Sequence, residues 1–228
     1  MLLHGFVRDA SLSVLGNWSG KGRDAASAVQ YIELESGGCH VPFSAQLRAL
    51  RNVREVIEMR AGAAFDADVG DDDCIRLERR VFTKVRTTAR GVESVRLTDV
   101  NDPFRRARKI AAMWRVDHVV TTILRRPSGD HIAVSSDVIT VGDFVEVTAT
   151  AHVELIRSRK RRGAKVTFQM HEVVRLYSAR EVAGLYKRPS TESDGAAATG
   201  ARACRVISIA RVRGGAGAGD VTMKPLSE

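Results

Sequence analysis

The chain has 228 residues, of which 44% are hydrophobic and 28% charged, a composition that suits a globular protein with one large β domain or two small ones. No apolar run approaches the about 20 residues of a spanning helix, so we expect no membrane association. The net charge of +9 is uneven, because residues 1–80 carry 10 Lys/Arg against 12 Asp/Glu whereas residues 81–228 carry 26 against 15. Positive charge concentrated in one part of a molecule attracts polyanions by counterion release, although solvating charge is the simpler alternative.

The first residues and the cysteines indicate in which cellular compartment the protein is located. Residues 1–6 lack the basic segment and the long apolar stretch of a signal peptide. Cys39, Cys74 and Cys204 are widely spaced and odd in number, which favours a reducing compartment over a disulfide scaffold. Short Lys/Arg-rich runs further along the chain also serve as nuclear import signals. We therefore expect an intracellular protein, located in the nucleus.

The first hundred residues are predicted to be rich in β-structure. Alternating hydrophobic residues indicate strands over residues 2–14 and 28–34. Between residues 43 and 59 hydrophobic residues recur three and four apart, which favours a helix, with a strand ending near Met59 as the alternative. An acidic loop at 61–73 precedes residues 75–85, whose alternation of hydrophobic and charged side chains predicts another strand.

A basic segment opens the second half of the chain. Asp102 before Pro103 is a helix-start signal, because proline is tolerated in the first turn, and a short basic helix is predicted from there to Trp114. At helical spacing the cations share one face and hydrophobic residues face the core: Arg105, Arg108 and Lys109 against Ile110 and Met113. An ordinary amphipathic helix would show the same pattern.

The clearest pattern is a β-hairpin over residues 141–176. Two runs that alternate between hydrophobic and polar residues flank a short loop, 157–163, that ends in glycine. The tip places six cations in nine residues with no acid among them: Arg157, Arg159, Lys160, Arg161, Arg162 and Lys165. Arginine forks held on a rigid hairpin suit bidentate contacts to a phosphate backbone, while an import signal and a solvated loop remain alternatives.

The chain as a whole divides into three predicted parts. Residues 1–100 form the β-rich N-terminal half, for which a separate barrel is an open alternative. Residues 101–188 form the basic, OB-like half. Residues 189–228 combine a flexible linker with one candidate strand at 204–212 and a low-complexity tail.

Metal, cofactor and catalytic motifs are missing from the sequence. The acidic residues 66–73 fail as a calcium loop, because the twelfth position is Leu77 instead of glutamate. The six histidines lack metal-ligand spacing, and His152 and His171 are expected on the polar faces of the hairpin strands, facing each other or solvent. No phosphate-binding loop, nucleophile elbow or dinucleotide fingerprint occurs, so we expect no cofactor.

Residues 138–147, Val-Ile-Thr-Val-Gly-Asp-Phe-Val-Glu-Val, resemble the opening of a strand in OB-fold nucleic-acid-binding proteins. In that family a Gly-Asp turn leads into a long curved strand and a basic hairpin, and the resemblance covers about residues 110–186. It implies a five-stranded barrel whose strand face and loops bind oligonucleotides, with the 157–163 tip as a binding loop. The aromatic content of 5% departs from the usual pattern of single-strand binders, which stack bases on aromatic rings.

These observations lead to one main hypothesis. We expect a mainly β protein, an OB-like barrel or sandwich with one or two short helices. We expect it to bind DNA or RNA without catalysis. Whether it forms a homo-oligomer is left open. The predicted contacts are Arg157, Arg159, Lys160, Arg161, Arg162, Lys165, Arg105, Arg106, Arg108, Lys109 and Trp114. A viral coat or nucleoprotein-type subunit is the alternative. A metal-dependent enzyme that uses the 66–73 carboxylates is a third hypothesis.

Overall fold

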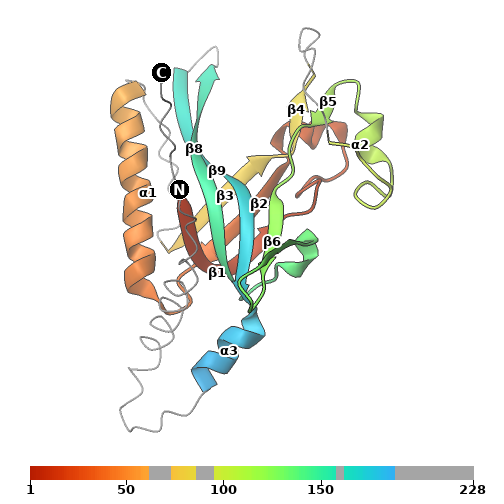
Figure 1. The fold of residues 1–228 in the computed structure, drawn as a ribbon. Coiled ribbons are helices and arrows are strands. Elements are labelled where there is room, and N and C mark those ends of the chain that lie inside the picture. Colours follow the sequence, from red (N-terminus) through yellow and green to blue (C-terminus); the bar gives the residue numbers. More distant parts are fainter. Residues whose placement is uncertain (62–72, 86–94, 158–161, 188–228) are drawn as a thin grey trace, which may run out of the picture.

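The computed structural model describes residues 1–61, 73–85, 95–157 and 162–187 (Figure 1). Its strands are β1 (Leu2–Ser11), β2 (Val29–Glu35), β3 (Cys74–Arg80), β4 (Phe82–Lys84), β5 (Trp114–Val116), β6 (Thr121–Arg125), β7 (His131–Ala133), β8 (Phe144–Arg157) and β9 (Arg162–Tyr177). Its helices are α1 (His40–Ala61), α2 (Arg106–Lys109) and α3 (Ala179–Lys187), with 3-10 turns η1 (Gly22–Ser27) and η2 (Ser136–Val138). The predicted linker, the 204–212 strand and the acidic loop up to residue 72 lie outside the described residues.

The main sheet joins both halves of the chain. Its order is β3-β2-β1-β8-β9-β6-β7, and β4 with β5 forms a second, two-stranded sheet. β1 pairs antiparallel with β2 on one side and with β8 on the other, and only β6 runs parallel to its partner, β9. Strands before and after residue 100 therefore share one sheet. The prediction of a mainly β, OB-like fold is confirmed.

The sheet curls so that its edge strand β3 approaches β9. Successive antiparallel pairing leaves β3 and β9 parallel, and the Arg79 guanidinium of β3 donates a hydrogen bond of 3.2 Å to the backbone carbonyl of Met170 on β9. No backbone ladder joins these two strands within the described residues, so the barrel is not closed. A five-stranded, partly open arrangement of this kind is typical of OB folds.

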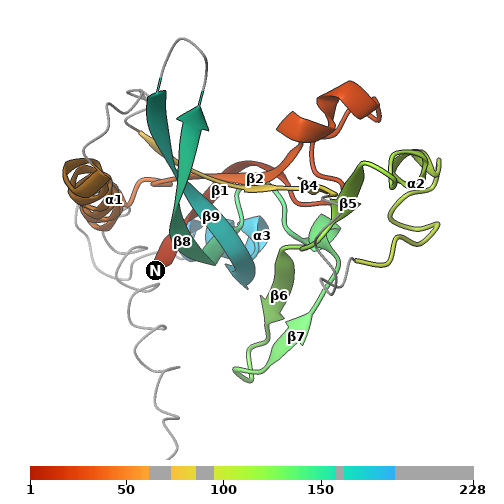
Figure 2. The ribbon, with the colours of Figure 1, turned by 90° about the horizontal axis from the view of Figure 1, so that it is seen from above.

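The β8–β9 hairpin is long because its alternating residues satisfy two environments. Val145, Val147 and Ala149 are fully buried, while the polar residues between them face outward. The ladder continues without a break from Ala149↔Met170 to Arg157↔Arg162, and the hairpin extends past the other strands of the sheet (Figures 1 and 2). The predicted hairpin at 141–176 is confirmed.

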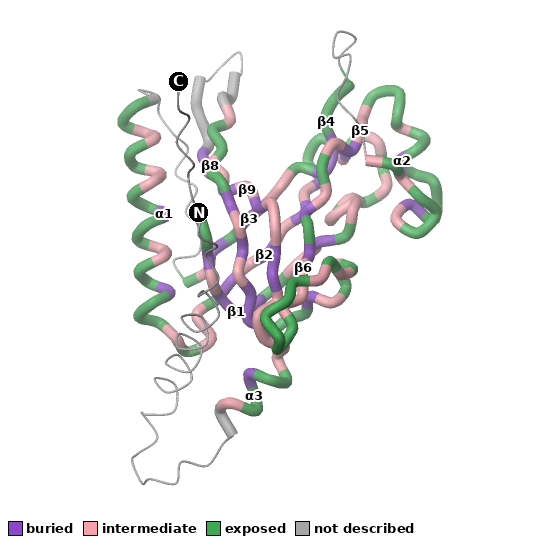
Figure 3. The backbone as a smooth tube through the Cα atoms, viewed as in Figure 1, coloured by how far each residue is buried: buried purple, intermediate pink, exposed green. Residues whose placement is uncertain are grey.

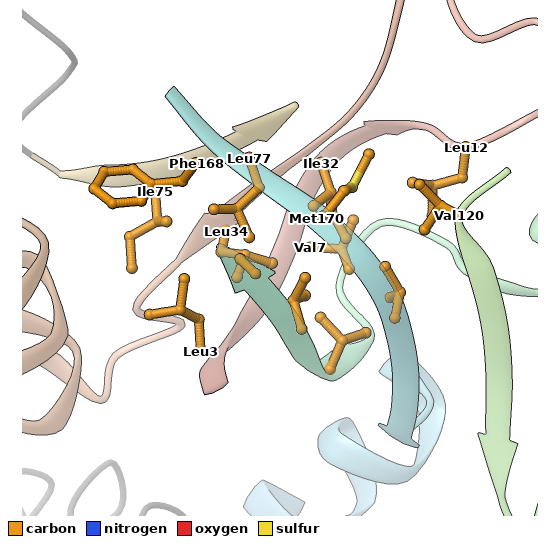
Figure 4. Close-up of a cluster of buried hydrophobic side chains, with 14 of the residues drawn as sticks. Leu3, Val7, Leu12, Ile32, Leu34, Ile75, Leu77, Val120, Phe168 and Met170 are labelled. Atoms are coloured by element: carbon orange, nitrogen blue, oxygen red, sulfur yellow. The ribbon is translucent and has the colours of Figure 1, made fainter. Parts of the chain in front are cut away.

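Helix α1 and the concave face of the sheet enclose the main core (Figure 4). Phe43 and Leu50 are the buried residues of α1, whose outer face is exposed (Figure 3). A Cβ at Gly5 on β1 would lie 2.9 Å from Leu34 Cβ and 3.2 Å from the Phe43 ring, so glycine allows this close approach. The helical interpretation of residues 43–59 holds over the strand alternative, and at 22 residues α1 is longer than the short helices expected.

A second core supports a side lobe, which comprises residues 12–28, β4, β5 and residues 95–113. Its buried residues are Ala25, Ala28, Val81, Phe82, Ala107 and Val116. The predicted helix to Trp114 is wrong in extent, because α2 covers only four residues and ends at Lys109. Helical spacing therefore does not apply to Met113, which is 57% exposed and does not face the core as predicted, whereas Ile110 packs against the lobe's core.

The Gly142-Asp143 turn of the OB-like motif has a structural role. Gly142 has φ +85°, and the Asp143 carboxylate, 1% exposed, accepts hydrogen bonds from the backbone N–H of Thr140 and of Ala179. The second bond anchors the start of α3, whose Val182 packs against Phe6 and Phe144.

Two further findings bear on expectations about the environment of the chain. Within the described residues, no helix is both long and apolar enough to cross a membrane. Cys39 is disulfide-bonded, a bond that the expectation of reduced cysteines did not include.

Candidate nucleic-acid interface

A groove of about 470 Å³ lies on the outer face of β3, at the open side of the barrel. It is bounded by the loop between β1 and β2, by β3 and by the β8–β9 hairpin. Its described lining residues are Asn17, Ala26, Ser27, Val29, Arg76, Glu78, Arg80, His152, Glu154, Thr167 and Gln169. The outward side chains of β3 reach this groove because they alternate with the buried Ile75 and Leu77.

The arginines of the groove are paired. Arg76 Nη1 lies 2.5 Å from Glu33 Oε1, and its guanidinium also stacks 4.4 Å above the ring of Tyr31. Arg80 forms a two-pronged bond to the carboxylate of Glu154, at 2.6 and 2.8 Å. The lining therefore presents polar groups with little net charge.

Two pKa shifts follow from these contacts. Burial opposes the charge of Arg76, but the hydrogen bond and the charge of Glu33 outweigh it and raise the pKa of Arg76. The hydrogen bond from the Tyr31 hydroxyl to Asp9 raises the pKa of Tyr31. Arg76 therefore stays charged and Tyr31 stays neutral across the physiological pH range.

The predicted hairpin contacts stand beside this groove. Arg157 ends β8 and Arg162 begins β9, and the ladder sets Lys165 opposite Glu154, which lines the groove. The structure thus places the base of the basic tip at the groove's rim. The side chains of residues 155–165 are not described, and Arg159, Lys160 and Arg161 lie outside the described residues.

The predicted contacts around α2 occupy the side lobe, on the other side of β2 and β3 from the hairpin (Figures 1 and 2). Arg105 and Arg108 approach the Asp99 carboxylate at 3.4 and 3.1 Å, all three side chains being substantially exposed. Within the described part of the chain, Arg106 and Lys109 have no acidic partner. These cations form a second basic surface.

Trp114 does not lie free on that surface. It is half-buried on β5 and packs against the side-lobe core. Phe82 is buried in the same core, where its ring meets that of Trp18 edge-on at 4.9 Å. Most aromatic residues near the basic segments are therefore structural.

The hairpin histidines do not face each other. His152 pairs with Thr167 in the ladder, while the His171 ring lies 2.7 Å from Thr150 Oγ1 and 2.7 Å from the Arg79 guanidinium. Burial, followed by the charge of Arg79, lowers the pKa of His171. No group of three or more metal-ligating side chains occurs among the described residues.

Comparison with known proteins gives structural likeness alone. No protein-family model matches the sequence, and no curated protein sequence matches it. The C-terminally truncated single-stranded DNA-binding protein of bacteriophage Enc34 aligns over 78% of this chain and 86% of its own, at 10% identity and a TM-score of 0.37. The same phage protein in complex with single-stranded DNA aligns over 78% and 86%, at 13% identity and a TM-score of 0.34.

A third solved structure is gp2.5, a single-stranded DNA-binding protein encoded by bacteriophage T7. It aligns over 85% of this chain and 99% of its own, at 10% identity and a TM-score of 0.38. At these identities and TM-scores the likeness assigns neither a family nor a function, so the function proposed below depends on this chain's own residues.

Sequence reasoning missed the groove itself. The shared parity of Arg76, Glu78 and Arg80 is visible in the sequence, but nothing there shows that His152 and Glu154 lie across from them. It also missed Phe104, which is 72% exposed beside the basic residues of α2.

Proposed function

We propose that this protein binds nucleic acid without catalysis, through the groove beside β3 and the two basic surfaces that flank it. The observation that carries the proposal is the position of the groove at the open side of an OB-like sheet, with the base of the Arg157–Lys165 hairpin tip at its rim. In OB folds, the strand face and the adjoining loops bind oligonucleotides.

The charges suggest that the groove and the two basic surfaces beside it contact different parts of a nucleic acid. Because Arg76 and Arg80 are paired with glutamates, the groove lining offers little attraction for phosphate. Its hydroxyl, amide and imidazole groups on Ser27, Gln169 and His152 suit hydrogen bonds to base edges. The backbone phosphates would then be held by the hairpin tip and by the cations of α2.

The binding partner is proposed to be a single strand. The base-edge groups of the groove are useful only when the bases are unpaired and splayed, because duplex edges are reached through the grooves of the helix. The solved structures named above make single-stranded DNA the first probe. Among the described residues, no observation favours the coat-subunit alternative, which called for a basic surface on the inside of an assembled particle.

The test is fluorescence anisotropy with single-stranded DNA, single-stranded RNA and duplex DNA across a salt series. The variant changes Arg159, Lys160 and Arg161 to alanine. The matched control changes Arg48, Arg126 and Arg180, which are exposed cations away from the groove, and therefore removes the same charge. We expect the hairpin variant to bind single strands much more weakly, with a salt slope lower by about 2, since each neutralised phosphate contributes about 0.7.

Each of three outcomes of this experiment would reject a stated part of the proposal. Absence of binding by the wild type to every probe at low salt would overturn the proposed function. Equal losses for the hairpin variant and its control would retain binding but reject the hairpin as its contact. Stronger binding to duplex than to single strands would contradict the single-strand assignment.

A further inference from the structure

Phe104 is an exposed aromatic residue next to the basic residues of α2. Its side chain is 72% exposed, on the turn that precedes α2 in the side lobe. An isolated exposed hydrophobic residue is ordinary on a protein surface. Phe104 differs because the guanidinium of Arg106 lies over its ring, 5.1 Å from the centroid. The cation supports the ring and leaves most of it accessible to a ligand.

Arg106 is itself held in place. The loop between β1 and β2 approaches its side chain at Gly20, where a Cβ would lie 2.6 Å from Arg106 Nη1 and 2.7 Å from Cδ. The φ of +85° at Gly20 is also one that glycine adopts readily. This loop carries Asn17 and Ser27, which line the groove. Phe104 and the groove are therefore linked through one loop.

A buried carboxylate fixes the turn that carries Phe104. Asp102 is 2% exposed, and its two oxygens accept hydrogen bonds of 2.8 and 3.1 Å from the backbone N–H of Arg106 and Arg108. Arg105, between Phe104 and this helix, has φ +52°, the only non-glycine residue of the described chain in the left-handed region. Such a conformation is uncommon outside glycine and persists where surrounding contacts determine it. The backbone of the turn next to Phe104 is thus set by the fold.

We propose that Phe104 is a stacking platform for an unpaired base, outside the barrel groove, with the cations of α2 holding the adjacent phosphates. The inference rests on the proposed function, since it extends the path of the same single strand from the groove across the loop of Gly20 to the side lobe. An aromatic ring backed by a cation and surrounded by further cations suits a base and its phosphate, because every base has a π-face.

The experiment compares Phe104→Ala and Phe104→Tyr with the wild type on an oligothymidylate of about 30 nucleotides, longer than the about 4–16 nucleotides that one OB fold covers. A second probe is an abasic oligonucleotide of the same length, which keeps the phosphates and lacks the bases. The matched control is Val100→Ala, another exposed hydrophobic residue of the side lobe. Thermal unfolding verifies that each variant is folded.

Phe104→Ala is expected to weaken oligothymidylate binding about 5- to 150-fold with an unchanged salt slope, and to leave abasic binding unaltered. Phe104→Tyr and Val100→Ala are expected to bind like the wild type. An unchanged oligothymidylate affinity in Phe104→Ala would overturn the platform while the proposed function stands, and would leave the ring as a contact for another protein. An equal loss on both probes would also overturn it. Absence of wild-type binding to both probes would instead reject the proposed function.

Discussion

Arg79 on β3 donates a hydrogen bond of 3.2 Å to the backbone carbonyl of Met170 on β9, across the gap that no backbone ladder bridges in the described residues. The same guanidinium lies 2.7 Å from the ring of His171. Burial lowers the pKa of Arg79. This side chain thus provides a direct hydrogen bond between β3 and β9.

Replacing Arg79 with methionine is expected to destabilise the protein by about 1–2 kcal/mol, because a half-buried, charge-assisted bond between β3 and β9 is lost. Urea unfolding measures the change, and the melting temperature should fall by about 3–6 °C. Arg80→Ala is the neighbouring control. Its pair with Glu154 is exposed and should contribute less than about 1 kcal/mol. Equal losses for the two variants would contradict a special role for Arg79.

His171 should make stability depend on pH. Burial, Arg79, His118 and the N-terminal amine all lower its pKa below the unfolded value of 6.5, so the unfolded chain binds the proton more readily. The stability that neutral His171 contributes to the folded state is therefore fully present above about pH 6.5 and is lost as the pH falls through the folded pKa of His171. Urea midpoints at pH 7.5 and 5.5 should differ more for the wild type than for His171→Gln. An identical pH dependence in both proteins would refute the assignment.

Asp143→Ala should cost about 1–3 kcal/mol, because the partly buried hydrogen bonds from the N–H groups of Thr140 and Ala179 lose their acceptor. The loss should concentrate at α3, whose first residue is Ala179, and hydrogen exchange of the α3 amides would detect it. Asp143→Asn keeps one acceptor oxygen and should be milder. Nucleic-acid affinity should stay unchanged, since Asp143 lies in the turn before β8 and does not line the groove. A loss of affinity at full folding would contradict this separation.

Asp102→Ala tests whether the turn that carries Phe104 matters for binding. Removing the carboxylate frees the N–H groups of Arg106 and Arg108, and should cost about 1–2 kcal/mol of stability. It should also weaken oligothymidylate binding in the same direction as Phe104→Ala, since the ring is no longer held. The double variant with Phe104→Ala should bind no worse than Phe104→Ala alone. Additive losses in the double variant would show that Asp102 acts independently of Phe104.

Local patterns determined the individual elements. The strict alternation around residues 157–163 predicted β8 and β9, and the spacing of three and four between residues 43 and 59 predicted most of α1. These predictions succeed because a strand with one buried face, or a helix with one buried stripe, places hydrophobic residues in the sequence at the period of that element. The clustering of cations at the hairpin tip is equally a property of the sequence alone.

The short basic helix shows where local patterns fail. Asp102 and Pro103 do mark a helix start, but the carboxylate bonds to the N–H groups of Arg106 and Arg108, and Arg105 takes a left-handed conformation. The helix therefore begins three residues later than the signal suggests. Trp114 was predicted as a contact, but the side-lobe core buries part of it, whereas Phe104, to which the sequence assigned no role, is left in solvent.

Composition and periodicity thus determined that this is a mainly β chain with a basic hairpin. The tertiary structure alone decided that β1 lies between β2 and β8, that Arg79 reaches Met170, and that β3 and the hairpin share a groove. Arg76 and Glu154 are far apart in the sequence, and their proximity depends on the register of three successive strand pairs. Periodicity specifies which face of a strand is buried, whereas the choice of neighbouring strand depends on packing among residues distant in the chain.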